Sequence, residues 1–160
     1  MWKYLLFLAT ASLLAVQVRA QDKSADLAVI VAKGSSLENL SSDELRRVFL
    51  EEKATDPDGH KYVVMMREPG SPEQKAALSV IYKFDQGQGQ FDTYFLRAVY
   101  SGHAQGKPQQ VNGGATVRQY VAATPGGIGY LRASEVDDSV KVIKVDGKSP
   151  GDADYPLKIK

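Results

Sequence analysis

The sequence predicts an α/β protein in which a mostly parallel sheet is flanked by helices. The stretches Asp26–Ala32 and Tyr62–Met66 are largely apolar runs, as in strands that are buried on both faces. Segments with apolar residues three and four positions apart lie after each run, and this spacing is typical of amphipathic helices. Because the two patterns alternate along the chain, we expect helices to cover the faces of one sheet.

Length and composition fit one domain. The chain has 160 residues, of which 43% are hydrophobic and 24% are charged, as in ordinary globular proteins. Its net charge of +1 argues against nucleic-acid binding, which depends on a strongly basic face. The absence of cysteine excludes disulfides, zinc–thiolate sites and a cysteine nucleophile.

Residues 1–20 are predicted to be a secretory signal peptide. Lys3 provides the positive start, Tyr4–Val16 is a mostly apolar run, and Val18 and Ala20 occupy the two positions that signal peptidase reads. The alternative is a transmembrane anchor, which needs about 20 apolar residues and therefore a longer run. We expect a periplasmic protein with one domain over residues 21–160. Without a lipobox cysteine, no lipid tether is expected.

The first two helices have recognisable start signals. Ser41 and Glu44 have the spacing of a capping box, in which each side chain binds the backbone N–H of the other. The second helix is expected to begin after Ser71, with Pro72 at its first position. Turn-forming residues 55–59 end the first unit. The apolar faces of these helices are Leu45, Val48 and Phe49, and Leu78, Ile81 and Tyr82.

The second half of the chain has the clearest amphipathic helix. Its apolar residues follow the spacing i, i+3, i+4, i+7 and i+8, at Phe91, Tyr94, Phe95, Ala98 and Val99. A polar loop over residues 101–110 follows, and a fourth helix is expected after Asn112–Gly114, with Val117, Tyr120 and Val121 on one face. The remaining expected elements are strands at Ile128–Leu131 and Val140–Val145, a helical turn over 133–138, and a tail, Leu157–Lys160, that pairs at a sheet edge.

The sequence does not indicate an enzyme. His60 and His103 are its only histidines, each in a turn-rich stretch, so no metal-ligand set is assembled. No G-x-S-x-G nucleophile elbow is present. We therefore expect no catalytic residues, no metal and no cofactor.

One group of residues is suited to binding an anion. Arg67 follows a buried strand, and Gly70 and Ser71 open the next helix. In open α/β sheets ligands bind beyond the carboxyl ends of strands, and a helix N-terminus attracts anions. The planar guanidinium matches phosphate or carboxylate. The alternative is structural, with Ser71 as a plain N-cap and Arg67 in an ion pair.

Two further loops could supply backbone N–H groups. Asn112–Gly114 precedes the fourth helix and could form an anion nest around Gly114, although a plain turn is the alternative. The loop Gly34–Ser36 follows the first strand, and we expect Ser35 and Ser36 to lie near Arg67.

Four stretches, in order, resemble the phosphate-binding proteins of phosphate ABC transporters, which have the class 2 periplasmic-binding-protein fold. They are Leu40–Phe49, Asp58–Met66, Arg67-x-x-Gly70-Ser71 and Val121–Tyr130, the last containing Thr-Pro-Gly-Gly-Ile-Gly-Tyr. The chain is most similar to the family's short members, which have about one of the two lobes. The resemblance implies an exported lobe without enzymatic activity.

The resemblance assigns phosphate contacts to Arg67 and Ser71. The chain also departs from the family at this stretch. Pro72 removes a backbone donor, Glu73 replaces a hydroxyl with a carboxylate, Pro69 stands where the family often has an acid, and Glu51 replaces a glycine.

The leading hypothesis from the sequence is a solute-binding-protein-like domain that binds phosphate or a related oxyanion weakly, for uptake or sensing with a membrane permease. The expected ligand-binding residues are Arg67, Gly70, Ser71, Ser35, Ser36 and Gly114. The alternative is a periplasmic accessory module that has lost tight ligand binding and docks another protein.

Overall fold

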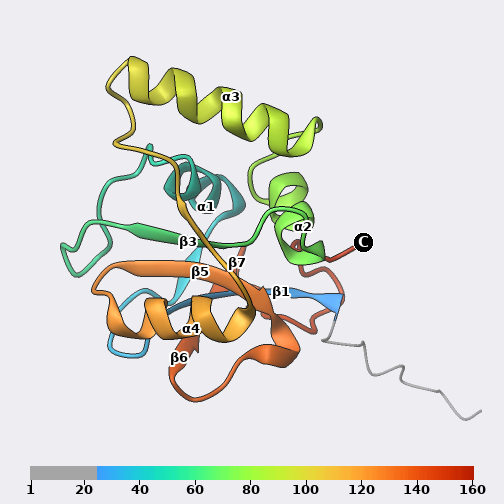
Figure 1. Cartoon of the computed structure of the whole chain (residues 1–160). Coiled ribbons are helices and arrows are strands. Elements are labelled where there is room, and N and C mark those ends of the chain that lie inside the picture. Colours follow the sequence, from blue (N-terminus) through green and yellow to red (C-terminus); the bar gives the residue numbers. More distant parts are fainter. Residues whose placement is uncertain (1–24) are drawn as a thin grey trace, which may run out of the picture.

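The computed structural model describes residues 25–160 (Figure 1), so the predicted signal peptide lies outside the described residues. The main sheet has five strands in the order β4-β3-β5-β1-β6. Its strands are β1 (Leu27–Ala32), β3 (Val63–Arg67), β4 (Gln109–Val111), β5 (Gly127–Arg132) and β6 (Val140–Val142). A small parallel pair is formed by β2 (Asn39–Leu40) and β7 (Lys144–Val145).

The predicted fold class is confirmed, with one strand reversed. β3 is parallel to both β4 and β5, whereas β1 is antiparallel to β5 and to β6. Four of the five strands therefore run in one direction, and β1 runs against them. A strand buried on both faces has the same apolar composition in either direction, so the sequence of β1 did not reveal this orientation.

Helices cover both faces of the sheet. They are α1 (Ser42–Phe49), α2 (Pro72–Val80), α3 (Gly87–Tyr100) and α4 (Gly114–Ala123), with a 3-10 turn at Ala133–Glu135. Figure 1 shows α1, α2 and α3 on one side of the sheet and α4 on the other. Alternate residues of β3 serve the two layers, because Met66 belongs to the core beneath α1–α3 and Met65 to the core beneath α4.

The larger core is rich in aromatic rings. The ring of Tyr82 contacts those of Phe49, Phe84 and Phe91, with centroids 5.4–5.7 Å apart. Tyr82 is fully buried, and its hydroxyl donates to the sulfur of Met66 over 3.2 Å. This packing fixes α2 and α3 against the sheet and thereby holds the start of α2 at the end of β3.

The predicted helix starts are confirmed. Ser41 and Glu44 form the capping box, and the Ser71 side chain caps α2 with Pro72 in its first turn. Two residues that were placed on apolar faces are exposed instead, Val99 and Tyr120, both at 43%.

The connections differ from the prediction in three places. Gln109 and Gln110 of the expected polar loop pair with β3 together with Val111, and Asn39–Leu40 pair with β7. The single strand expected over 140–145 is divided between the two sheets. Short polar strands take their pairing from their neighbours rather than from their own composition. The tail pairs as predicted, through a bridge between Lys158 and Asp26.

Candidate functional site: an anion site occupied by carboxylates

The candidate site lies at the edge of the sheet where β3 and β4 end. Arg67 is the last residue of β3 and pairs in register with Val111 of the parallel strand β4. α2 begins five residues after Arg67, and α4 begins three residues after Val111. Two helix N-termini therefore lie next to one guanidinium, which is the arrangement expected of an anion site.

The Arg67 side chain is ion-paired within the protein. Its Nε and Nη2 donate to the two carboxylate oxygens of Glu68 over 2.9 and 3.1 Å. Its Nη1 lies 3.4 Å from Glu135 and 3.6 Å from Glu73. Only 11% of the side chain is exposed, so three carboxylates surround a nearly buried guanidinium.

Glu68 also occupies the N-terminus of α4. Its Oε2 accepts a hydrogen bond from the backbone N–H of Gly113, the residue before that helix, over 3.1 Å. The same oxygen accepts from Arg67 Nε. The Glu68 carboxylate thus accepts hydrogen bonds from both the Arg67 guanidinium and a loop N–H. These are the kinds of donor that the sequence predicted for a bound oxyanion.

Glu135 fills the space beside Gly114. A Cβ added to Gly114 would lie 2.8 Å from the Glu135 carboxylate, so glycine at this position leaves room for the acid beside the first turn of α4. Glu135 also accepts from the backbone N–H of Arg132 over 3.3 Å. The 3-10 turn after β5 is what brings this carboxylate to the site.

Glu73 forms an ion pair with a second arginine, Arg132, in addition to Arg67. It is 5% exposed, and its Oε1 accepts from Nε of Arg132 over 2.8 Å and lies 2.8 Å from Nη2 of the same residue. A buried carboxylate is stable only when it is paired. The ion pair with Arg132, at the end of β5, therefore explains why a buried glutamate is stable at the start of α2.

The Ser71 hydroxyl acts both as a hydrogen-bond donor and as an acceptor. Its hydroxyl donates to the Glu68 carbonyl over 3.0 Å and accepts from the backbone N–H of Gln74 over 3.2 Å. Gly70 has a φ of 88°, in the region that favours glycine, and donates its N–H to the Gln74 side chain. The start of α2 is therefore closed by local hydrogen bonds.

The electrostatics follow from these contacts. Hydrogen bonding from Arg67 lowers the pKa of Glu68 from 4.5 to about 2, and the same contact raises the pKa of Arg67. Beneath them the Tyr130 hydroxyl, whose pKa is raised mainly by burial, accepts from the Arg67 backbone N–H over 3.3 Å. Ionised, three carboxylates outnumber two guanidiniums, so the site has a local charge of −1.

Four of the six residues expected to bind a ligand lie together. Arg67, Gly70, Ser71 and Gly114 share this edge of the sheet. Ser35 and Ser36 were expected beside them, and this placement is wrong. They follow β1, which is antiparallel to β5, so their loop lies at the opposite edge, where Ser36 N–H donates to Asp58.

Sequence reasoning missed Arg132 and Glu135 as members of the site. Arg132 is the last residue of β5 and Glu135 lies three residues after it, and β5 is parallel to β3 and beside it. Charged residues just after a second parallel strand are a signal that could have been used, because the carboxyl ends of parallel strands meet at one edge.

Among residues 25–160, the groups that could supply three metal ligands are limited to Asp56, Asp58 and His60, whose candidate atoms lie within 4.8 Å of one another. Asp56 Oδ1 accepts from the His60 backbone N–H, and Asp58 Oδ2 accepts from that of Ser36. These carboxylates serve the turn that precedes β3. Over the same residues, no helix combines the length and the apolar character needed to cross a membrane.

Comparison with known proteins shows the fold. No protein-family model matches the chain. An ABC-type phosphate transport receptor from Vibrio cholerae is 18% identical, with a TM-score of 0.64 over 82% of this chain and 52% of the receptor. PstS from Borrelia burgdorferi is 14% identical, with a TM-score of 0.63 over 84% and 55% of the two chains. PfluDING, a high-affinity periplasmic phosphate-binding protein solved with phosphate, is 23% identical, with a TM-score of 0.52 over 84% and 39%.

The resemblance predicted from the sequence is thereby confirmed at the level of fold. The chain spans 39–55% of the length of these three solved proteins, as expected of a single lobe. The compared proteins are binding proteins rather than enzymes.

Proposed function

We propose that this chain is a periplasmic accessory module, built on one lobe of the solute-binding fold, that docks another protein of the cell envelope rather than capturing phosphate. One observation carries this choice. The donors of the anion site that come from Arg67 and Gly113 are bound to the protein's own carboxylates, chiefly Glu68. The predicted signal peptide supports the location.

The energy of phosphate binding argues in the same direction. Charge-assisted hydrogen bonds net about 1.5–3 kcal/mol each and a helix terminus adds about 0.3–1 kcal/mol, so an open site of this kind would gain about 3–6 kcal/mol. Displacing Glu68 forfeits contacts of the same strength, and the local charge of −1 repels an anion. Even millimolar binding requires about 4 kcal/mol. Phosphate therefore has little to gain from the closed site.

The second candidate is weak binding of phosphate or a related oxyanion for uptake or sensing with a permease. It is favoured by the position of Arg67, Gly70, Ser71 and Gly114 around one point, and by the phosphate-binding proteins among the compared structures. This function requires Glu68 and Glu135 to move aside, or a second protein surface to complete the site.

Isothermal titration with phosphate separates the two candidates. We expect no saturable heat from the unmodified chain, and millimolar binding by the double variant Glu68→Gln and Glu135→Gln, which keeps side-chain size and removes two charges. The matched control is Asp138→Asn, an exposed acid away from the site. Submillimolar binding by the unmodified chain that disappears in Arg67→Ala would overturn the proposal.

Docking is tested by affinity capture from the periplasm of the source cells. The proposal expects one partner at a fixed stoichiometric ratio whose recovery does not change when phosphate is added. Recovery of a transporter permease only in the presence of phosphate would favour the second candidate instead.

A further inference from the structure

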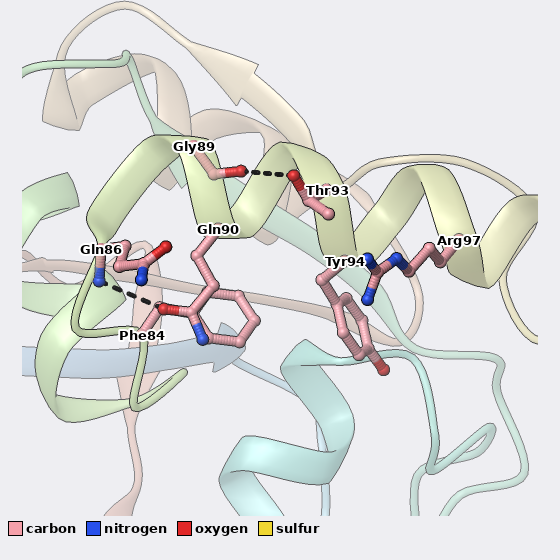
Figure 2. A pocket seen from close by; sticks show the side chains of 7 residues that line it. All are labelled: Phe84, Gln86, Gly89, Gln90, Thr93, Tyr94 and Arg97. Atoms are coloured by element: carbon pink, nitrogen blue, oxygen red, sulfur yellow. Dashed lines mark hydrogen bonds between the residues drawn. The ribbon is translucent and has the colours of Figure 1, made fainter.

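A concave surface lies on α3, away from the Arg67 site. It is a hollow of about 380 Å³ lined by Phe84, Gln86, Gly89, Gln90, Thr93, Tyr94 and Arg97. Figure 2 shows these side chains along one face of the helix and the segment before it. The volume is in the range of small-ligand sites, and none of the lining residues is acidic.

The hollow has an aromatic floor. Phe84 is 5% exposed, and its ring centroid lies 5.7 Å from that of Tyr94. The Tyr94 hydroxyl lies 3.2 Å from the Leu50 carbonyl and 3.3 Å from Glu52 Oε1, and its one hydrogen bonds to either acceptor, so the ring is fixed from its far end. Two rings in fixed positions provide a surface for an apolar or aromatic group, at little cost in side-chain entropy.

Two of the polar side chains of the hollow, Arg97 and Gln90, have N–H donors without a partner in the part of the chain that the structure describes, whereas the Thr93 hydroxyl donates to the Gly89 carbonyl. Among residues 25–160, nothing forms an ion pair or hydrogen bond with the Arg97 guanidinium, although Arg46, Arg67, Arg118 and Arg132 all have such partners. The amide oxygen of Gln90 accepts from the Gln86 backbone N–H, which leaves the Gln90 NH₂ available. Figure 2 shows the Arg97 side chain extending along the helix toward Tyr94.

The spacing places these groups together. Gln90, Tyr94 and Arg97 stand at i, i+4 and i+7 of α3, which is one face of a helix. Gly89 is on the same hollow, and a Cβ added there would meet nothing within 4 Å. Packing therefore does not require glycine at position 89, so a larger side chain can be introduced at this lining position to test the hollow.

From this arrangement we infer that the α3 hollow, defined by the seven residues above, binds an apolar carboxylate, with the apolar group over Phe84 and Tyr94 and the carboxylate on Arg97 and Gln90. A planar guanidinium pairs with a carboxylate through two parallel hydrogen bonds, which a neutral amide cannot reproduce. The carboxylate could belong to a free small acid or to the C-terminus of a peptide. This inference is independent of the function proposed for the Arg67 site.

The test uses N-acetylphenylalanine and its uncharged amide as probes, followed by NMR of the backbone amides of the full chain. We expect the acid to bind with a dissociation constant of about 1 mM and to shift the signals of Gln90, Tyr94 and Arg97. The amide should bind at least about fivefold more weakly, because it loses the charge-assisted pair.

Variants locate the binding. Arg97→Gln should weaken binding of the acid to the level of the amide, and Gly89→Leu should abolish binding of both by filling the hollow. Arg47→Gln is the matched control, because Arg47 is an exposed arginine on α1 whose guanidinium also has no partner among residues 25–160. Equal affinity for acid and amide, or unchanged binding by Arg97→Gln, would overturn the inference.

A third probe, the tetrapeptide Gly-Gly-Gly-Phe, distinguishes the two sources of the carboxylate. Tighter binding than N-acetylphenylalanine identifies a peptide C-terminus as the ligand, and equal binding identifies a small acid. Absence of shifts at α3 with all three probes would refute the site, whatever the outcome of the phosphate titration.

Discussion

The contact between Glu68 and Arg67 makes stability depend on acid pH in a way that one substitution should remove. The pKa of Glu68 is lowered from 4.5 to about 2, chiefly by hydrogen bonding from Arg67. A lowered pKa means that the folded state holds the ionised form. Its contribution to stability is therefore complete above pH 4.5 and is lost progressively as the pH falls toward 2.

The magnitude can be bounded from the structure. A shift of this size corresponds to at most about 3 kcal/mol. Because 31% of the Glu68 side chain is exposed, solvent screening reduces the expected value to about 1–2 kcal/mol. Glu68→Gln should lower the free energy of unfolding by that amount at pH 7 and by almost nothing near pH 2.

Urea unfolding followed by far-UV circular dichroism, repeated from pH 7 to pH 2.5, measures this difference. Asp138→Asn serves as the control, since its exposed side chain lies outside the ion-pair group, and its curve should run parallel to that of the unmodified chain. If the Glu68→Gln curve also runs parallel over the whole range, Glu68 does not hold Arg67 in solution, and the description of a closed anion site is wrong.

Three further changes test how the site is supported. Ser71→Ala should destabilise the chain by about 1 kcal/mol in urea titrations, since the N-cap of α2 is lost. Tyr82→Ala should cost about 3–5 kcal/mol by leaving a cavity among the aromatic rings, whereas Tyr82→Phe should cost under about 1.5 kcal/mol; equal losses would show that the hydroxyl, not the ring, matters. Gly126→Ala should lower the melting temperature by several degrees, because φ is 76° and the added Cβ would lie 2.1 Å from the Lys61 carbonyl.

Some of the site was predictable because it is local in sequence. A buried strand, an arginine at its end and a serine N-cap lie within nine residues, from Val63 to Ser71, and local rules for strands and caps place all of them. The same rules placed Gly114 at the start of a helix. That Gly114 lies near Arg67 then follows from the parallel pairing of β3 with β4.

The rest was not predictable because it depends on the order of the strands. Glu135 is 68 residues from Arg67 in the sequence, and it reaches the site only because β5 lies beside β3 in the same direction. Ser35 and Ser36 were misplaced for the same reason. Apolar composition identifies a buried strand, but the direction of β1 is decided by pairing with β5 and β6.

The ion pairs also explain how this lobe can be stable without a ligand. In the family that the sequence resembles, the position of Glu73 has a hydroxyl, and an acid there would be costly if Arg67 were its only partner. Arg132 supplies a second guanidinium 2.8 Å away, so the buried carboxylate is paired from two strands. Glu73→Thr should therefore destabilise the chain, because it removes the carboxylate that Arg132 contacts over 2.8 Å, whereas the double variant of Glu73→Thr with Arg132→Leu should recover part of the loss. Urea unfolding measures both variants: recovery in the double variant would show that the two residues are energetically coupled, and equal losses in the single and double variants would contradict that coupling.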